Sequence, residues 1–191
     1  MSEFELVPIT EVDVERTATD LHACLQEQET YRQLKRHLPG PLSYGESIEA
    51  AEQRLINNQE IAKEDSRFKP FVQLLGEHAI GIAVLDERLE AKRRRLMAGI
   101  YIGHITTTGP STSSWIARPY QGRGYGRQSL EARIKIATVE NGHDGLWTVV
   151  DTGNDVSRCN VMARGFVPLY TGGSWVGGQT FKDATVYQYL A

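Results

Sequence analysis

Cysteines, aromatic residues and long hydrophobic runs are all scarce in this sequence. Two of its 191 residues are cysteines, and 8% are aromatic. Cys24 and Cys159 stand far apart, outside any C-x-x-C pair or Cys/His cluster, so we expect two reduced core thiols and neither a disulfide framework nor a metal site. No apolar run approaches the ~20 residues that cross a bilayer, and no basic-then-apolar leader opens the chain. We therefore expect no membrane span and a cytoplasmic protein.

The sequence also lacks an excess of basic charge. Its formal net charge is -3, with 24% charged residues, which argues against a nucleic-acid-binding protein. One basic run, Lys92 to Arg95, follows Glu87, Arg88 and Glu90 at helical spacing, and we interpret it as a solvated helical connector. The alternative is a basic patch for RNA or an acidic partner. Such a patch would need interleaved aromatic residues, which this stretch lacks.

The first third of the chain has the pattern of one strand and two helices. Polar and apolar residues alternate from Phe4 to Ile9, as in an edge strand that tolerates proline. Apolar residues at helical spacing then run from Ala18 to Leu34, and the proline- and glycine-rich stretch 37–41 ends this helix. Ser43 and Glu46 have the spacing of a capping box, which predicts the start of a second helix.

From residue 71 onward, short apolar runs alternate with helical periodicity, which predicts a mixed α/β sheet. The first four predicted strands follow one another as a meander, and the last two close the sheet as a pair. The predicted strands are 71–75, 80–84, 100–105, 113–116, 146–150, 166–167 and 185–189, with helices over 124–141 and from Asn154 or Asp155 to Gly165. The length suits one domain, so we expect a single domain over 1–191.

Paired glycines surround Trp175 in the stretch 171–178. One interpretation is a mobile flap over a bound substrate. The other is a simple hairpin tip, which we favour because connecting segments with this composition are common at the surface.

The most informative segment is a glycine-rich turn between a strand and a helix, Gln121-Gly122-Arg123-Gly124-Tyr125-Gly126-Arg127. Glycines let successive backbone N–H groups converge on phosphate oxygens, and the first turn of the following helix adds a partial positive charge. Arg123 and Arg127 add full charges nearby. Three glycines flanked by two arginines exceed what a connecting turn requires, so the segment predicts a binding site for a phosphate-bearing ligand.

Two common nucleotide motifs do not fit this turn. A dinucleotide fingerprint counted from Gly122 would need Gly or Ala where Arg127 stands, and it would lie near the start of a βαβ unit. A Walker-type loop needs Gly-Lys followed by Ser or Thr, and the turn contains no such triplet. ATP and GTP are therefore not the expected ligands.

The turn instead resembles the Q/R-x-x-G-x-G/A acetyl-CoA signature of the GNAT acetyltransferase superfamily. Asn154, Ser157 and Gly165-Phe166 resemble the N-x-x-S...G-F segment that follows it, and they are most like the ribosomal-protein N-terminal acetyltransferase branch. The resemblance is strong over 113–166 and loose before residue 70. It implies a GNAT-type α/β fold, with a central mixed, mostly antiparallel twisted sheet flanked by helices, and acetyl-CoA (coenzyme A) as the cofactor.

The resemblance also implies roles for individual residues. Pantetheine in this superfamily pairs like an extra strand with the splayed strand before the signature, and the diphosphate lies on the amides of the turn. Asn154 and Ser157 would flank the pantetheine arm and the thioester, and the alternative for Asn154 is a plain helix cap. The expected cofactor-binding residues are Ile116, Ala117, Arg118, Gln121, Gly122, Arg123, Gly124, Tyr125, Gly126, Arg127, Asn154 and Ser157.

The catalytic acid and base are less well defined. Many members of the superfamily carry a Glu where Ser111 or Thr112 stands here, and a Tyr acid where Val161 stands. Ser157 resembles the serine that donates a proton to the thiolate in the ribosomal branch, and a small polar helix residue is the alternative. His104 is the best remaining base candidate because its pKa would lie near neutrality, although a strand histidine is more often structural.

The expected acceptor is a primary amine. An α-amine of pKa ~7.8 is far more often neutral at pH 7 than a lysine amine of pKa ~10.4, and the difference is about 3.5 kcal/mol. Without a dedicated carboxylate base, we expect an N-terminal α-amine or a low-pKa small-molecule amine. The missing acid and base also leave open a catalytically idle acyl-CoA sensor or scaffold, and relatives in the superfamily leave a homodimer open.

Overall fold

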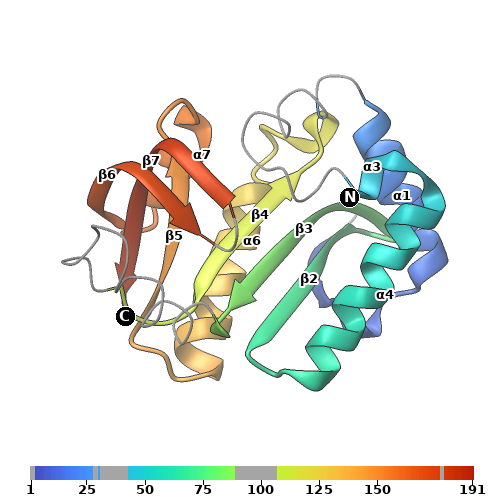
Figure 1. Cartoon of the computed structure of the whole chain (residues 1–191), viewed down its shortest axis with the longest axis horizontal. Helices are drawn as coiled ribbons and strands as arrows, with labels where there is room; N and C mark the ends of the chain where they lie inside the picture. Colours follow the sequence, from blue (N-terminus) through green and yellow to red (C-terminus); the bar gives the residue numbers. More distant parts are fainter. Residues whose placement is uncertain (1–2, 28–29, 31–42, 89–106, 177–178) are drawn as a thin grey trace. The chain divides into compact units, whose positions relative to one another are not determined.

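The computed structural model describes residues 3–27, 30, 43–88, 107–176 and 179–191, and hydrogen bonds join seven strands of this part of the chain into one sheet (Figure 1). The strand order is β1-β2-β3-β4-β5-β7-β6. The strands are β1 (Phe4–Pro8), β2 (Phe68–Leu75), β3 (His78–Asp86), β4 (Ser111–Ile116), β5 (Gly145–Asp151), β6 (Val167–Val176) and β7 (Gln179–Leu190). The pairs β1/β2, β5/β7 and β6/β7 are antiparallel and β4/β5 is parallel, which confirms the predicted mixed, mostly antiparallel sheet.

The helices begin at short polar side chains that accept hydrogen bonds from the first turn. Asp13 caps α1 by accepting from the Arg16 N–H at 2.8 Å, and Ser47 caps α4 by accepting from the Ala50 N–H at 3.0 Å. No helix in the described ranges is long and apolar enough to cross a membrane. The helices are α1 (Val14–Gln26), α3 (Ser43–Glu46), α4 (Ile48–Glu64), α6 (Tyr125–Lys135) and α7 (Asp155–Met162), with 3-10 turns η1 (Ile9–Glu11) and η3 (Arg118–Tyr120).

Contacts divide the chain into two compact units. Unit 1 comprises residues 1–84 and 114–129, and unit 2 comprises 85–113 and 130–191. In unit 1, α1 and α4 pack their apolar sides around side chains that are at most 1% exposed, namely Ile9, Leu21, Leu25, Leu55 and Val72. In unit 2, Leu146 of β5 is fully buried. The single domain over 1–191 remains a prediction.

The second helix does not begin as the capping-box spacing predicts. Ser43 is the first residue of the short helix α3, and the chain breaks at Ser47, whose extended backbone (φ -159°, ψ 170°) starts the 17-residue α4. Two serines four residues apart precede the same apolar run, and only Ser47 stands directly before it. The first helix is shorter than predicted, because α1 ends at Gln26 and the backbone of Glu27 is extended (φ -66°, ψ 116°), so no single helix runs on to Leu34. The predicted strand 100–105 lies outside the described residues, as does the charged run from residue 89.

The helix after the glycine turn also differs from its prediction near the end. After α6 the chain continues as one π-helical segment, η4 (Ile136–Glu140), in which the Asn141 N–H donates to the Ile136 carbonyl at 3.0 Å. The wider turn changes which side chains face inward. Ala137 is buried, whereas Val139, which the predicted buried face of the helix over 124–141 includes, is 72% exposed.

Part of the glycine-rich stretch 171–178 belongs to the sheet. Residues up to 176 belong to β6, and the pairing with β7 continues as far as Val176↔Gln179. Residues 177–178 lie outside the described residues, so the hairpin tip that the sequence favours stays a prediction.

The two cysteines lie on helices, but only one is a core residue. Cys24 of α1 is partly buried, and burial raises its pKa to about 11, so its thiol stays protonated at neutral pH. Cys159 of α7 is exposed, which corrects the expectation of two core thiols, because it lies on the exposed face of the helix together with Asp155 and Met162.

In unit 1, the contact between β3 and β4 depends on a glycine and a glutamine. A Cβ at Gly81 would overlap the main-chain oxygen of Trp115, so β4 passes too close to β3 for any side chain at this position. Gln73 of β2 is fully buried, and its Nε2 donates to the carbonyls of Ile82 at 2.9 Å and Trp115 at 2.8 Å. The one side chain thus hydrogen-bonds to the backbone of both β3 and β4.

We expect the substitution Gly81→Ala to destabilise the protein by about 3 kcal/mol, because the added methyl group meets backbone that cannot rotate away. Gly153→Ala is the matched control, since its Cβ would meet only the Asp151 side-chain oxygen at 3.2 Å. Urea unfolding followed by circular dichroism measures both. Equal midpoints for Gly81→Ala and the parent protein would contradict the close approach of β3 and β4.

Candidate functional site

The glycine-rich turn lies between β4 and α6, as the sequence predicts. After β4 ends at Ile116, the chain forms the 3-10 turn η3 and then passes through Gly122 (φ 73°) and Gly124 (φ 89°) before α6 begins at Tyr125. Both glycines have left-handed backbone conformations that other residues rarely adopt. A Cβ at either position would meet nothing within 4 Å, so conformation rather than crowding requires glycine, and the outer side of the turn is open.

Side chains of the turn fix it at both ends. At the β4 end, the Gln121 Nε2 donates to the Ile116 carbonyl at 2.7 Å. At the α6 end, the Tyr125 ring stacks on Phe4 of β1 with centroids 5.6 Å apart and an interplanar angle of 14°. The side chains of the predicted cofactor residues Gln121 and Tyr125 therefore anchor the turn. The turn conformation orients only the backbone groups of these two residues.

The donor set of this turn suits a diphosphate. The backbone from Gln121 to Arg127 combines two left-handed glycines with the N-terminal turn of an 11-residue helix, where N–H groups point outward. Arg123 and Arg127 are exposed and add two guanidinium groups that match phosphate oxygens. The turn can thus hold two adjacent phosphates by backbone N–H groups and neutralise them with two arginines, all within unit 1.

The backbone of the residues that precede the turn is largely occupied by bonds within unit 1. The Ala117 N–H donates to the Ile80 carbonyl at 2.9 Å, and the carbonyls of Ala117 and Arg118 accept from the next turn. The Arg118 N–H donates to the Thr30 Oγ1 at 2.8 Å. Ala117 and Arg118 lie beyond the end of β4, so the strand available to an added partner ends at Ile116.

Asn154 and Ser157 belong to unit 2, whereas the glycine turn belongs to unit 1. Asn154 is the N-cap of α7, and its Oδ1 accepts from the Ser157 N–H at 3.1 Å. Its own N–H donates to the Asp151 carbonyl at 2.9 Å. The helix-cap interpretation of Asn154 is thus observed, and it orients the first turn of α7, where Ser157 is partly exposed.

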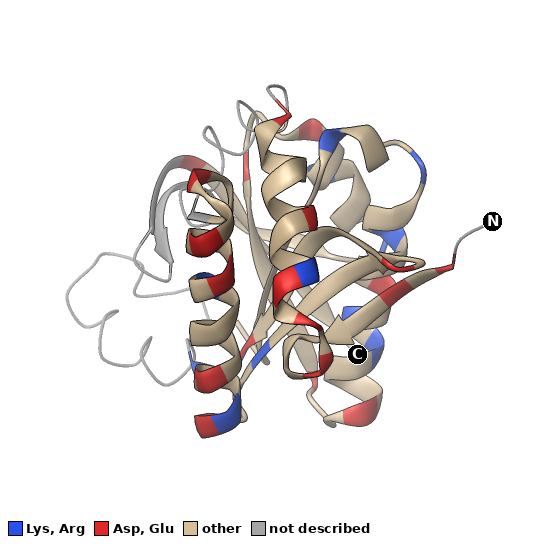
Figure 2. Ribbon diagram, turned by 90° about the vertical axis from the view of Figure 1, so that its right-hand side faces the viewer, with Lys and Arg blue, Asp and Glu red and all other residues tan. Residues whose placement is uncertain are grey.

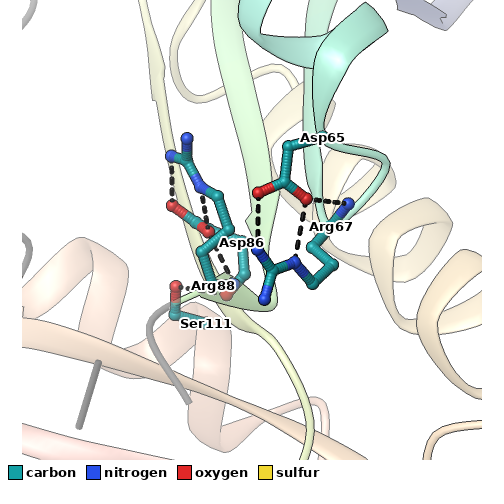
Figure 3. Close-up of polar contacts among 5 residues, drawn as sticks. All are labelled: Asp65, Arg67, Asp86, Arg88 and Ser111. Carbon is teal, nitrogen blue, oxygen red and sulfur yellow. Dashed lines mark hydrogen bonds and ion pairs between the residues drawn. The ribbon is translucent and has the colours of Figure 1, made fainter. Parts of the chain in front are cut away.

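The hydroxyl groups at the start of β4 form structural hydrogen bonds. The resemblance described above places a Glu here in many members of the superfamily. The Ser111 hydroxyl donates to the Asp86 carbonyl at 3.2 Å, beside the ion pair of Asp86 with Arg88 (Figure 3). The Thr112 hydroxyl accepts from Arg133, which is 3% exposed and also donates to the Ser113 carbonyl at 3.1 Å. Burial lowers the pKa of Arg133 to about 9. Ser111 and Thr112 therefore pack unit 2 rather than supply a base.

Val161 stands where many members of the superfamily carry a Tyr acid, and His104 is the candidate base. Val161 is buried, 6% exposed, and its carbonyl accepts from the Phe166 N–H at 3.2 Å, so it closes the end of α7 as a core residue. His104 lies outside the described residues.

Buried polar side chains bond to β4 and to Arg118 across the sequence, and sequence patterns did not identify them. Thr30, Gln73 and Arg133 are buried polar side chains that donate or accept across large sequence separations. Their only signal in the sequence is a polar residue at a position where the pattern predicts an apolar one. Gln73, in the middle of the apolar run 71–75, is the clearest instance.

Comparison with known proteins places this geometry in a family. The acetyltransferase (GNAT) domain family matches residues 3–167. No curated protein sequence matches the chain significantly. Among solved structures, the ribosomal L7/L12 alpha-N-protein acetyltransferase RimL in complex with coenzyme A has a TM-score of 0.73 and 16% identity, covering 100% of this chain and 95% of that chain.

Two other solved structures are similar to the same extent. The microcin C7 self-immunity acetyltransferase MccE, in complex with acetyl-CoA and AMP, has a TM-score of 0.71 and 13% identity over 99% of this chain and 93% of that chain. A Vibrio cholerae protein described as a ribosomal-protein-serine acetyltransferase has a TM-score of 0.71 and 17% identity over 100% of this chain and 95% of that chain. Identities this low support the fold alone. Because the family match spans most of the sequence and includes the glycine turn, the chain belongs to the GNAT acetyltransferase family, whose members use acetyl-CoA as the acetyl donor.

Proposed function

We propose that this acetyltransferase acetylates an α-amine of a peptide or protein N-terminus, or a small-molecule amine of similarly low pKa. The open turn at Gln121–Arg127, with two left-handed glycines and two exposed arginines, is the observation that supports cofactor binding in this proposal. Acetyl-CoA supplies an acetyl group activated as a thioester. The chain's own residues then have to hold the diphosphate, orient the thioester and handle the protons.

The binding residues divide by task. The backbone N–H groups from Gln121 to Arg127 would hold the diphosphate, with Arg123 and Arg127 neutralising its charge. Ile116 is the last β4 residue and would offer its backbone edge to the pantetheine arm. Asn154 would keep α7 in place through its cap and so orient Ser157, whose hydroxyl would deliver a proton to the departing thiolate.

The acceptor preference follows from the residues at the start of β4. Ser111 and Thr112 hold structural hydrogen bonds, so these positions provide no carboxylate to remove a proton from an ammonium group. An amine that is already partly neutral at pH 7 needs less assistance, and an α-amine meets this condition better than a lysine by about 3.5 kcal/mol. His104 remains the proposed base.

The charge of unit 1 favours an acceptor with positive charge near its amine. Acidic residues outnumber Lys and Arg in both described segments that contain α1 and α4, and Figure 2 shows acidic positions repeated along helices on this side. Segment 3–27 has Glu3, Glu5, Glu11, Asp13, Glu15, Asp20 and Glu27 against Arg16, and segment 43–65 has Glu46, Glu49, Glu52, Glu60, Glu64 and Asp65 against Arg54 and Lys63. Such a field attracts cationic peptides and repels acidic ones.

The proposal also covers the location, domain organisation and oligomeric state of the enzyme. We place it in the cytoplasm as one domain over 1–191 that acts on a free amine and not on nucleic acid, either alone or as a homodimer. The alternative, an idle acyl-CoA sensor or scaffold, shares the cofactor site and differs only in turnover.

A panel of peptides tests the reaction. With acetyl-CoA at pH 7, we expect a basic peptide with a free α-amine to be acetylated at least tenfold faster than an N-blocked peptide with one lysine, because more of the α-amine is neutral. Mass spectrometry of the products measures both rates, and an acidic peptide of equal length controls for charge. Faster reaction of the lysine peptide would refute the α-amine preference, and tight coenzyme A binding with no product from any amine would favour the sensor.

Removing one charge from the turn tests the cofactor site. We expect Arg123→Gln to raise the Kd for coenzyme A about tenfold at low ionic strength, since a charge-assisted hydrogen bond to phosphate is lost. Lys63→Gln in the last turn of α4 removes the same charge elsewhere in unit 1 and should leave the Kd unchanged. Isothermal calorimetry at two salt concentrations measures the effect, which should shrink at high salt. Equal affinities of the two variants at low salt would contradict the site.

Ser157 is tested through kcat. We expect Ser157→Ala to lower kcat about a hundredfold while the Kd for coenzyme A stays within twofold, because a general acid acts in the transition state and not in cofactor binding. Ser157→Thr keeps a hydroxyl and should recover part of kcat. If Ser157→Ala keeps more than half of the parental kcat, the thiolate receives its proton from another group.

A further inference from the structure

A buried hydroxyl of the N-terminal segment holds the first residue of η3 in place. Thr30 is 1% exposed, and its Oγ1 accepts from the Arg118 N–H at 2.8 Å, although the two residues are 88 positions apart. The Thr30 hydroxyl in turn donates to the Glu27 Oε2 at 2.6 Å, and the Thr30 N–H donates to the same oxygen at 2.6 Å. All three residues belong to unit 1.

The chemistry of these bonds makes them directional. A threonine hydroxyl has one proton, and the Glu27 carboxylate can only accept, so the proton must point toward Glu27. The Thr30 lone pairs then face the Arg118 N–H. A carboxylate that accepts two bonds at one oxygen also restrains the Thr30 rotamer, so Glu27 determines how strongly Thr30 holds Arg118.

Arg118 passes this restraint to the cofactor turn. Its carbonyl accepts from the Gln121 N–H at 3.1 Å, and its Nη1 donates to the Gln121 Oε1 at 3.3 Å. The same Gln121 carboxamide donates to the Ile116 carbonyl, and Gly122 follows directly. The orientation of Arg118 therefore sets both the end of β4 and the entry to the left-handed glycines.

We propose that Glu27 and Thr30 are positioning residues for the cofactor segment Ile116–Gln121, and that they determine the affinity for acetyl-CoA without contacting it. The inference rests on the proposed function of the turn. It also assigns the Arg118 N–H to Thr30, so the pantetheine arm pairs with Ile116 and not with the Arg118 N–H. Loss of the Thr30 hydroxyl leaves a backbone donor without its acceptor and lets η3 reorient.

Thr30→Val tests the proposal with a side chain of nearly the same shape. We expect the KM for acetyl-CoA and the Kd for coenzyme A to rise about tenfold while kcat stays within twofold, because the variant disturbs the binding geometry and no reacting group. Thr30→Ser keeps the hydroxyl and should restore the parental values to within twofold. Glu27→Gln weakens the acceptor for the Thr30 hydroxyl and should raise both constants about threefold. Steady-state kinetics and calorimetry provide these constants.

Asp20→Asn is the matched control for a general loss of stability. The Asp20 Oδ2 of α1 accepts from the Ala79 N–H at 2.8 Å, a carboxylate-to-backbone bond in the same unit that holds β3. We expect it to lower Tm without changing the Kd for coenzyme A. The inference fails if Thr30→Val and Glu27→Gln bind coenzyme A as the parent does, or if Asp20→Asn weakens binding equally. If Thr30→Val does not fold, Glu27→Gln and Thr30→Ser decide by the same criteria. A parent protein that does not bind coenzyme A at all would instead refute the proposed function.

Discussion

Every N–H and C=O group at the end of a buried strand needs a hydrogen-bond partner, and in unit 1 this requirement governs the approach to the glycine turn. At the end of β4, side chains supply part of it. The Gln73 carboxamide donates to the Trp115 carbonyl, the Gln121 carboxamide donates to the Ile116 carbonyl, and the Thr30 hydroxyl accepts from the Arg118 N–H. Two side chains from distant parts of the sequence and one from the turn itself thus hold a stretch of four residues in one geometry. The turn that follows inherits this geometry, because a glycine segment has little conformational preference of its own and takes its direction from the residues before it.

In the proposed function, the residues for cofactor binding and the residue for proton transfer come from different units. The turn, its anchors and its arginines all lie in unit 1. Ser157 lies in unit 2, on a helix whose start is fixed by the Asn154 cap. At the start of β4, a buried arginine and two hydroxyl groups occupy the positions where a carboxylate base would stand. An enzyme organised in this way gains most from binding energy and orientation, and it leaves the protonation state of the amine largely to the choice of substrate.

The glycine turn, the following helix and most strands could be predicted because each depends on local sequence. Left-handed glycines at 122 and 124, a cap at Asn154 and a strand over 146–150 all follow from residues that are neighbours in the chain. What escaped prediction depends on tertiary contacts. The π-helical segment at 136–140 widens a helix whose apolar spacing looks regular, and it turns Val139 outward. Ser43 and Ser47 are both plausible caps, and the structure begins α4 after Ser47. The partners of Thr30 and Gln73 are 88 and 42 residues away, a distance over which no sequence spacing carries information.

The proposed preference for an α-amine reduces the need for a dedicated carboxylate base. A general base typically accelerates a reaction by about 10²- to 10⁴-fold, which corresponds to about 3–5 kcal/mol of barrier. The higher neutral fraction of an α-amine compared with a lysine amine amounts to about 3.5 kcal/mol at pH 7. Choosing the more acidic ammonium group therefore offsets much of the loss. The acidic residues of segments 3–27 and 43–65 act in the opposite direction, because negative charge raises the pKa of a nearby ammonium. Since exposed charges are screened beyond roughly 8–10 Å, the acidic residues can attract a basic peptide chain and still leave the pKa of its terminal amine low, provided the amine itself lies away from them.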